Sequence, residues 1–429
     1  MTSQMVTKHF QAAQEARQKG NLVLARQSLE MALQLDPQNA GIHNALGNLE
    51  LDARNFQKAA DHYRAAIAAD GKAPVLWLNL ARAMREGGDA PGEKEALDAA
   101  LALDQRNFLA RVRRAEWFDR HDQAADGFLD WSGILQMLSS ADAEDPAIAD
   151  VLSKAKGAVE AFMAQFSAVV DPAMQEASEG LGYEEVRRVN AFVDTALGRR
   201  RIYRNECAGL MYPMLPADEF FPRSHFPWMD FFEEKIPAIR NELEALLRDQ
   251  EGSFRPYVSM APGTPENKWS PLNNSKSWNA GYLWKYGQPC SDVLERCPET
   301  AMALSQVKDR FDAPGRGPTA FFSLLQPHSH IPPHTGVSNL RAIIHVPLIV
   351  PAGCWFRVGG ETRVWEEGKI FAFDDTIEHE ARNESDALRG ILIFDVWNPH
   401  ILPHERDLIR QFFKSAEAAG MPNESQFDI

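Results

Sequence analysis

Three side chains in the last quarter of the chain have the types and spacing of a metal site. His334 and His379 lie 45 positions apart, and Arg389 follows the second histidine by ten. Non-haem iron oxygenases hold Fe(II) with two histidines, often joined by one carboxylate, and leave positions open for a chelating keto-acid and dioxygen. An arginine beyond the second histidine suits the distal carboxylate of that keto-acid, because a guanidinium pairs with a carboxylate through two hydrogen bonds.

The strand that Arg389 heads places it on one face with every second residue: Ile391, Ile393 and Asp395. A turn at 383–386 is expected to bring the strands of His379 and Arg389 alongside each other. A buried arginine needs an anion. That anion is either the keto-acid or, in a purely structural role, Asp375 or Glu380.

His345 stands on the apolar run 341–350, where it shares a face with Ile343 and Pro347. It is a candidate for the co-substrate pocket, and the alternative is a hydrogen-bonded core histidine. A different metal site would use His328, His330 and His379, as cupin-like proteins do. Pro327, Pro332 and Pro333 disfavour a regular strand around the first two, so the pair His334 and His379 is preferred.

The sequence predicts a series of short strands in the second half of the chain. Turn residues separate six candidate strands: 319–326, 341–350, 354–358, 362–365, 369–373 and 388–397. Many short strands at regular spacing favour a sandwich or barrel of the jelly-roll type. One helix is expected at 228–248. The long loop 261–274 is a candidate functional loop.

The first third repeats every 34 residues. Equivalent positions hold Asn21, Asn55 and Asp89 at helix starts, and Ala32, Ala66 and Ala100 inside helices. A third register holds small residues where two helices would cross: Ala13, Gly47, Ala81 and Ala115. This period is typical of tetratricopeptide repeats, which stack into a solenoid that often binds a peptide or protein. We expect a repeat domain over 1–140, a helical connector over 141–200 and the strand-rich domain over 201–429.

Composition narrows the class of protein. The formal net charge of −15 argues against nucleic-acid binding, which needs excess Lys and Arg. No run of about 18 apolar residues predicts a membrane span, and no signal core follows the N-terminus, so a cytoplasmic protein is expected. Four cysteines do not make a disulfide framework. Cys290 and Cys297 either pair under oxidation or remain reduced.

Several motifs together resemble the aspartyl/asparaginyl β-hydroxylase family. The resemblance covers roughly 205–405, and 319–399 carries most of its weight. The matching residues are Phe322-Ser323-Leu324-Leu325, His334-Thr335-Gly336, Asn339, Arg341, His345, Val364-Trp365-Glu366-Glu367-Gly368-Lys369, Phe373-Asp374-Asp375, Glu378-His379-Glu380 and Phe394-Asp395-Val396-Trp397.

The resemblance implies a double-stranded β-helix fold, a cupin-like barrel, with Fe(II), 2-oxoglutarate and O2. His334 and His379 would be the iron ligands, and Arg389, Ser323 and His345 would hold the carboxylates of 2-oxoglutarate. Members of the family also carry tetratricopeptide repeats in front. Gly336 stands where other oxygenases place Asp or Glu, which is normal for this family. We expect Gly336→Asp to bind iron at least as tightly without improving hydroxylation.

The resemblance also implies the reaction. A 2-oxoglutarate-dependent dioxygenase would hydroxylate a C–H bond and release succinate and CO2. The expected substrate is the β-carbon of Asp or Asn in a peptide or protein that the repeats contact. Two alternatives stay open: the same chemistry on a small molecule or lipid, and a catalytically inactive repeat-barrel scaffold, which the missing carboxylate at Gly336 motivates.

Overall fold

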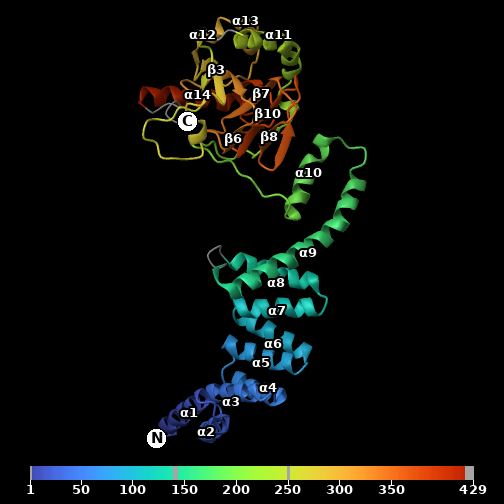
Figure 1. Ribbon diagram of the computed structural model, residues 1–429, viewed down its shortest axis with the longest axis vertical. Helices are drawn as coiled ribbons and strands as arrows, with labels where there is room; N and C mark the ends of the chain where they lie inside the picture. Colours follow the sequence, from blue (N-terminus) through green and yellow to red (C-terminus); the bar gives the residue numbers. More distant parts are fainter. Residues whose placement is uncertain (1, 139–143, 249–251, 421–429) are drawn as a thin grey trace. The chain divides into compact units, whose positions relative to one another are not determined.

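The chain divides into two compact units in a computed structural model that describes residues 2–138, 144–248 and 252–420 (Figure 1). Unit 1 is Met1–Gly180 and unit 2 is Leu181–Ile429. The division falls inside the expected connector, 141–200. The two helices of this segment therefore belong to different units.

Unit 1 is a stack of antiparallel helix pairs. Its helices are α1 (Thr2–Gln18), α2 (Leu22–Leu35), α3 (Ala40–Asp52), α4 (Phe56–Ala69), α5 (Pro74–Glu86), α6 (Ala90–Leu103), α7 (Phe108–Arg120), α8 (Ala124–Met137) and α9 (Pro146–Ala177). Asn21, Asn55 and Asp89 precede α2, α4 and α6, as predicted. The predicted helical-repeat solenoid is confirmed, and α7 with α8 forms a fourth helix pair.

The small residues of the repeat lie where helices cross. Ala32, Ala66 and Ala100 are fully buried. A β-carbon on Gly47 would lie 2.6 Å from the ring of Tyr63 on α4, so only glycine lets the two helices approach this closely. The 34-residue period of the sequence is thus the period of the packing.

Unit 2 is built from antiparallel strands with helices outside them. The helices are α10 (Tyr183–Ala196), α11 (Met229–Arg248), α12 (Ser291–Leu294), α13 (Pro298–Ser305) and α14 (Pro403–Ala418). The strands are β1 (Phe220–Phe221), β2 (Arg255–Pro256), β3 (Trp278–Lys285), β4 (Gln288–Pro289), β5 (Ala320–Leu325), β6 (Ser329–His334), β7 (Arg341–Ile349), β8 (Cys354–Val358), β9 (Glu361–Val364), β10 (Phe371–Phe373), β11 (His379–Asn383) and β12 (Arg389–Trp397).

Two sheets share these strands. The larger sheet has the order β1-β10-β7-β12-β5-β3-β2, with β4 paired to β3, and the smaller has the order β6-β11-β8-β9. The pairings between these strands are antiparallel in both sheets. The six predicted strands are all present, and the predicted helix is α11.

The prolines do not prevent a strand at β6, contrary to the expectation from the sequence. β6 contains Pro332 and Pro333 and pairs with β11. It is the edge strand of the smaller sheet, where a missing N–H on the outer side breaks no ladder bond. A register shift between His379 and Ala381 accommodates the irregularity.

Two apolar cores lie on opposite faces of the larger sheet. The outer core packs α11 side chains, such as Phe232 and Leu243, against Phe322 and Ile344 of the sheet. The inner core joins the two sheets, with Ile391 from β12 and Phe356 from β8 in one cluster. Because strand residues alternate between faces, the polar residues that share the inner face are held between the sheets.

No helix among the described residues is long and apolar enough to cross a membrane.

Candidate active site

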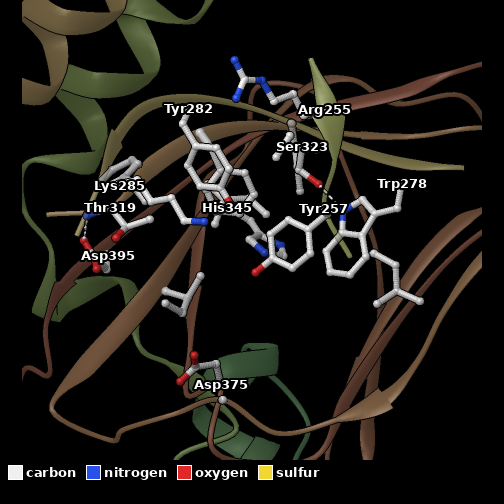
Figure 2. Close-up of a pocket in the computed structure, with 18 of the residues that line it drawn as sticks. Arg255, Tyr257, Trp278, Tyr282, Lys285, Thr319, Ser323, His345, Asp375 and Asp395 are labelled. Atoms are coloured by element: carbon white, nitrogen blue, oxygen red, sulfur yellow. Dashed lines mark hydrogen bonds between the residues drawn. The ribbon is translucent and has the colours of Figure 1, made fainter. Parts of the chain in front are cut away.

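A cavity of about 730 Å³ opens on the inner face of the larger sheet (Figure 2). All five residues that the sequence singled out line it: Ser323, His334, His345, His379 and Arg389. The face predicted for β12 is confirmed, since Ile391, Ile393 and Asp395 also line the cavity.

His334 and His379 form a pair across two neighbouring strands. They are direct register partners, one at the end of β6 and the other at the start of β11. Their ring centroids are 4.0 Å apart. The Nδ1 of His334 lies 2.8 Å from the carbonyl oxygen of Pro332, and that of His379 lies 3.0 Å from the carbonyl oxygen of Ile377. A carbonyl only accepts, so each Nδ1 carries the hydrogen and each Nε2 keeps its lone pair for a metal.

Burial keeps both rings neutral. It lowers the pKa of His379 to about 4 and the pKa of His334 well below its usual range. A metal binds the neutral imidazole, so the pair is ready to bind without losing a proton first. Within the described ranges, no three His, Cys, Asp or Glu side chains gather to hold a metal ion. A metal on this pair would therefore have two protein ligands there.

Arg389 is buried without a carboxylate partner among the described residues. It is 1% exposed, its Nε has no hydrogen-bond partner, and its Nη1 donates to the carbonyl and hydroxyl oxygens of Ser323 at 3.3 and 3.2 Å. Its guanidinium lies 5.1 Å from the ring centroid of Trp365. Burial lowers the pKa of Arg389 to about 10, so it is still charged at neutral pH. A buried, uncompensated cation is a site for an anion.

The structural alternatives for Arg389 do not form. Glu380 pairs with Arg357 at 2.5 Å, and Asp375 lies 3.9 Å from Arg341. Both carboxylates that the sequence offered as ion-pair partners are thus engaged with other arginines.

His345 lies near Arg389 with an unsatisfied nitrogen. Its Nδ1 is buried and has no hydrogen-bond partner. Burial, and then the charge of Arg389, lowers the pKa of His345 well below its usual range. A core histidine is normally hydrogen-bonded. The unpaired nitrogen therefore favours the co-substrate role over the core alternative.

The cupin-like alternative is not assembled. His328 is exposed and lies 2.9 Å from Asp386, while His330 lies 2.8 Å from Glu380. Neither histidine lines the cavity.

The strands of His379 and Arg389 do not lie alongside each other, contrary to the expectation from the sequence. β11 belongs to the smaller sheet and β12 to the larger one. The turn between them crosses from sheet to sheet, and Asn383 anchors it by donating to the carbonyl oxygens of Leu325 and Ala387 at 3.0 and 2.8 Å. The two residues consequently meet in the cavity from different sheets.

Gly336 is required for space and not for an unusual backbone angle. It is absent from the glycines with positive φ. A β-carbon there would lie 2.1 Å from the Oδ2 atom of Asp375. The carboxylate of Asp375 fills the place of a side chain at 336, so a larger residue there requires Asp375 to move. That Gly336→Asp binds iron at least as tightly stays a prediction.

Three aromatic residues near the site were missed in the sequence. Trp278 and Tyr257 line the cavity, and their rings stack with centroids 3.8 Å apart. Trp269 packs edge-on against His334 at 5.0 Å. Trp269 lies in the loop 261–274, which its length had marked as functional. No clear strand pattern in the sequence marked β3, which carries Trp278. Only Trp278, Ala280 and Tyr282 alternate along it on the face toward the cavity.

The fold and the site define a class: a helical-repeat protein whose antiparallel-sheet domain encloses a histidine pair and a buried arginine. A sequence model described as aspartyl/asparaginyl beta-hydroxylase matches residues 233–399. Over these residues the chain therefore matches the family that the motifs suggested.

Two relatives are similar to part of this chain. The aspartyl/asparaginyl beta-hydroxylase of Mus musculus is 35% identical over 175 residues, which are 41% of this chain and 22% of that protein. The ornithine lipid ester-linked acyl 2-hydroxylase of Rhizobium tropici is 32% identical over 198 residues, 45% of this chain and 66% of that protein. The chain thus spans about a fifth of the mouse protein's length.

Two solved structures show a weak likeness to this chain. The MamA protein has a TM-score of 0.32 at 16% identity and covers 42% of this chain and 98% of its own. A tetratricopeptide repeat protein from Parabacteroides merdae has a TM-score of 0.32 at 18% identity and covers 46% of this chain and 75% of its own. At these scores the repeat assignment depends on the helix pairs themselves.

Proposed function

We propose that the protein is an Fe(II)- and 2-oxoglutarate-dependent dioxygenase that hydroxylates a C–H bond. The proposal depends on two groups of nitrogen atoms that line the same cavity. His334 and His379 present neutral ring nitrogens, and Arg389 and His345 present buried nitrogens without partners. The first set fits a divalent metal and the second fits a carboxylate.

Each residue has a distinct task in this proposal. His334 and His379 would hold the metal, with their rings fixed through Nδ1 by backbone carbonyls. Arg389, with Ser323 and His345, would hold the carboxylates of 2-oxoglutarate. The metal would supply the activation of dioxygen, with succinate and CO2 as co-products. The two sheets and their inner core support the finer fold assignment, a double-stranded β-helix of the jelly-roll type.

The substrate proposed first is the β-carbon of an Asp or Asn residue in a peptide or protein, in keeping with the family. The repeat unit is the proposed recruiting surface, because such solenoids commonly bind peptides. A lipid substrate is the second candidate, since the Rhizobium tropici relative is named as a lipid acyl hydroxylase. An inactive scaffold is the weaker alternative, since the histidine pair and the buried arginine are both present.

The test is succinate formation by the full chain with Fe(II), 2-oxoglutarate and dioxygen. His379→Ala should abolish it, because one ligand alone holds the metal weakly. His328→Ala is the matched control, since that histidine is exposed and pairs with Asp386 away from the cavity. Candidate peptides and lipids are then screened for the mass of one added oxygen atom. Full activity and metal occupancy in His379→Ala would refute the assignment.

A further inference from the structure

The hydroxyl group of Ser323 receives two hydrogen bonds from residues that can only donate. Trp278 Nε1 donates to Ser323 Oγ at 3.0 Å (Figure 2). Arg389 Nη1 donates to the same oxygen at 3.2 Å. Ser323 is fully buried and lines the cavity. A serine hydroxyl has two lone pairs and one hydrogen. With both lone pairs occupied, its hydrogen is left for a third partner.

Among the described residues, none accepts that hydrogen in a hydrogen bond, and Ser323 faces the cavity. We infer that Trp278 is a positioning residue: its indole N–H fixes Ser323 as a hydrogen-bond donor toward the carboxylate that Arg389 holds. This rests on the proposed function. The consequence is selectivity. A site of donors alone accepts a carboxylate, which offers two acceptor oxygens, and disfavours a primary amide, whose NH2 group would face another donor.

The indole ring is held in the orientation that this role requires. Trp278 is 5% exposed and stacks on Tyr257, with an interplanar angle of 18°. The backbone N–H of Tyr257 also donates to the carbonyl oxygen of Trp278 at 2.9 Å. The ring of Trp269 also stacks with that of Trp278, at a centroid distance of 6.3 Å, and it packs against His334. The indole of Trp278 is therefore hydrogen-bonded to Ser323, and through the ring of Trp269 it is also in contact with His334, a proposed metal ligand.

The experiment measures binding and not turnover. The full chain, loaded with Mn(II) and without dioxygen, is titrated by calorimetry with 2-oxoglutarate and with 2-oxoglutaramate, whose distal carboxylate is an amide. Trp278→Phe keeps a ring in place and removes the N–H. One lone pair of Ser323 then becomes free, so its hydroxyl can accept from the amide. We expect the preference for the carboxylate to fall on the order of tenfold, with Mn(II) affinity unchanged.

Two further variants sharpen the test. Ser323→Ala should lower the preference to a similar extent, and adding Trp278→Phe to it should lower it no further, because both changes act through one hydroxyl. Trp284→Phe is the matched control. It lies on the same strand, but beyond a register shift it packs against the outer core. It should retain the wild-type preference.

The outcomes separate this inference from the proposed function. If Mn(II)-loaded wild type does not bind 2-oxoglutarate, the proposed function fails. If wild type binds it, and Trp278→Phe weakens both ligands equally or neither, the role of Trp278 is overturned. Should Trp278→Phe not fold, Tyr257→Leu removes the stacked ring instead, and a preference equal to that of wild type would overturn the inference.

Discussion

Asp375 occupies the space that a side chain at Gly336 would need. A β-carbon on Gly336 would lie 2.1 Å from one carboxylate oxygen of Asp375 and 2.7 Å from the other. The backbone N–H of Gly336 also donates to the carbonyl oxygen of Asp375 at 2.6 Å. Asp375 lies in the connection between β10 and β11, just before His379. Its carboxylate fills the position two residues after His334, where a third metal ligand would be expected.

Adding a side chain at 336 should therefore destabilise the domain. We expect Gly336→Ala to cost on the order of 1–3 kcal/mol of unfolding free energy, as other overpacked sites do. Gly336→Asp should cost more, because it also brings two carboxylates together. The double variant Gly336→Asp/Asp375→Gly should recover much of the loss. Denaturant unfolding measures each value, and a single Gly336→Asp as stable as wild type would contradict the packing.

Metal binding should resist mild acid. Protons compete with a metal for imidazole, and the competition begins at the pKa of the ring. Burial lowers the pKa of His379 from 6.5 to about 4 and lowers that of His334 as well, so the competition moves to lower pH. We expect Mn(II) affinity to fall by less than about threefold between roughly pH 7.5 and 5.5, where two ordinary histidines would lose about a hundredfold.

Asp374 also titrates within this pH range, because burial raises its pKa to about 6. A control variant is therefore needed to separate its titration from that of the histidines. Asp374→Asn removes this titration and should leave the pH profile of Mn(II) binding flat. A profile that falls steeply below pH 6.5 in both proteins would mean that the histidine pair is more accessible to water than the structure shows.

Replacing Arg389 should stabilise the ligand-free chain and weaken the binding of 2-oxoglutarate. An uncompensated buried charge is costly, so Arg389→Met should stabilise the ligand-free chain by about 1–4 kcal/mol. The same variant should lose about 2–5 kcal/mol of 2-oxoglutarate binding, with the charge-assisted pair gone. Thermal unfolding with and without 2-oxoglutarate and Mn(II) measures both. Arg382→Met, at a site that is 49% exposed, is the matched control. Unchanged 2-oxoglutarate affinity in Arg389→Met would mean that another cation, such as Lys369 or Arg341, holds the carboxylate.

A chain without the repeat unit should be more stable when it begins at Leu181 than when it begins at residue 200. Tyr183 on α10 donates to Glu361 at 2.7 Å, and Arg187 donates to the carbonyl oxygen of Phe220 at 2.8 Å. A chain that begins at Leu181 keeps these bonds and should unfold at a higher temperature than one that begins at residue 200. We expect it to bind 2-oxoglutarate as the full chain does and to lose turnover of a peptide substrate. Equal peptide turnover would make the repeats a structural appendage.

The sequence by itself determined the features that depend on local periodicity. The 34-residue spacing of Ala32, Ala66 and Ala100 predicted the helix pairs, because one residue type recurs only where the same packing recurs. Alternation along 388–397 predicted which side chains of β12 face the cavity. The motifs around His334, His379 and Arg389 were sufficient for the family. The cytoplasmic location and the cofactors are still predictions.

Tertiary structure decided what depends on residues far apart in the chain. Pro332 and Pro333 are tolerated because β6 is an edge strand, a property of the sheet order and not of the segment. His379 and Arg389 belong to different sheets, and Asn383 holds the turn between them by donating to the carbonyl oxygen of Leu325, 58 residues away. The space beside Gly336 is filled by Asp375, and the hydroxyl oxygen of Ser323 accepts a hydrogen bond from Trp278, 45 residues away. In each case a side chain is constrained by a partner brought near only by folding, so its role could not be read from its neighbours in sequence.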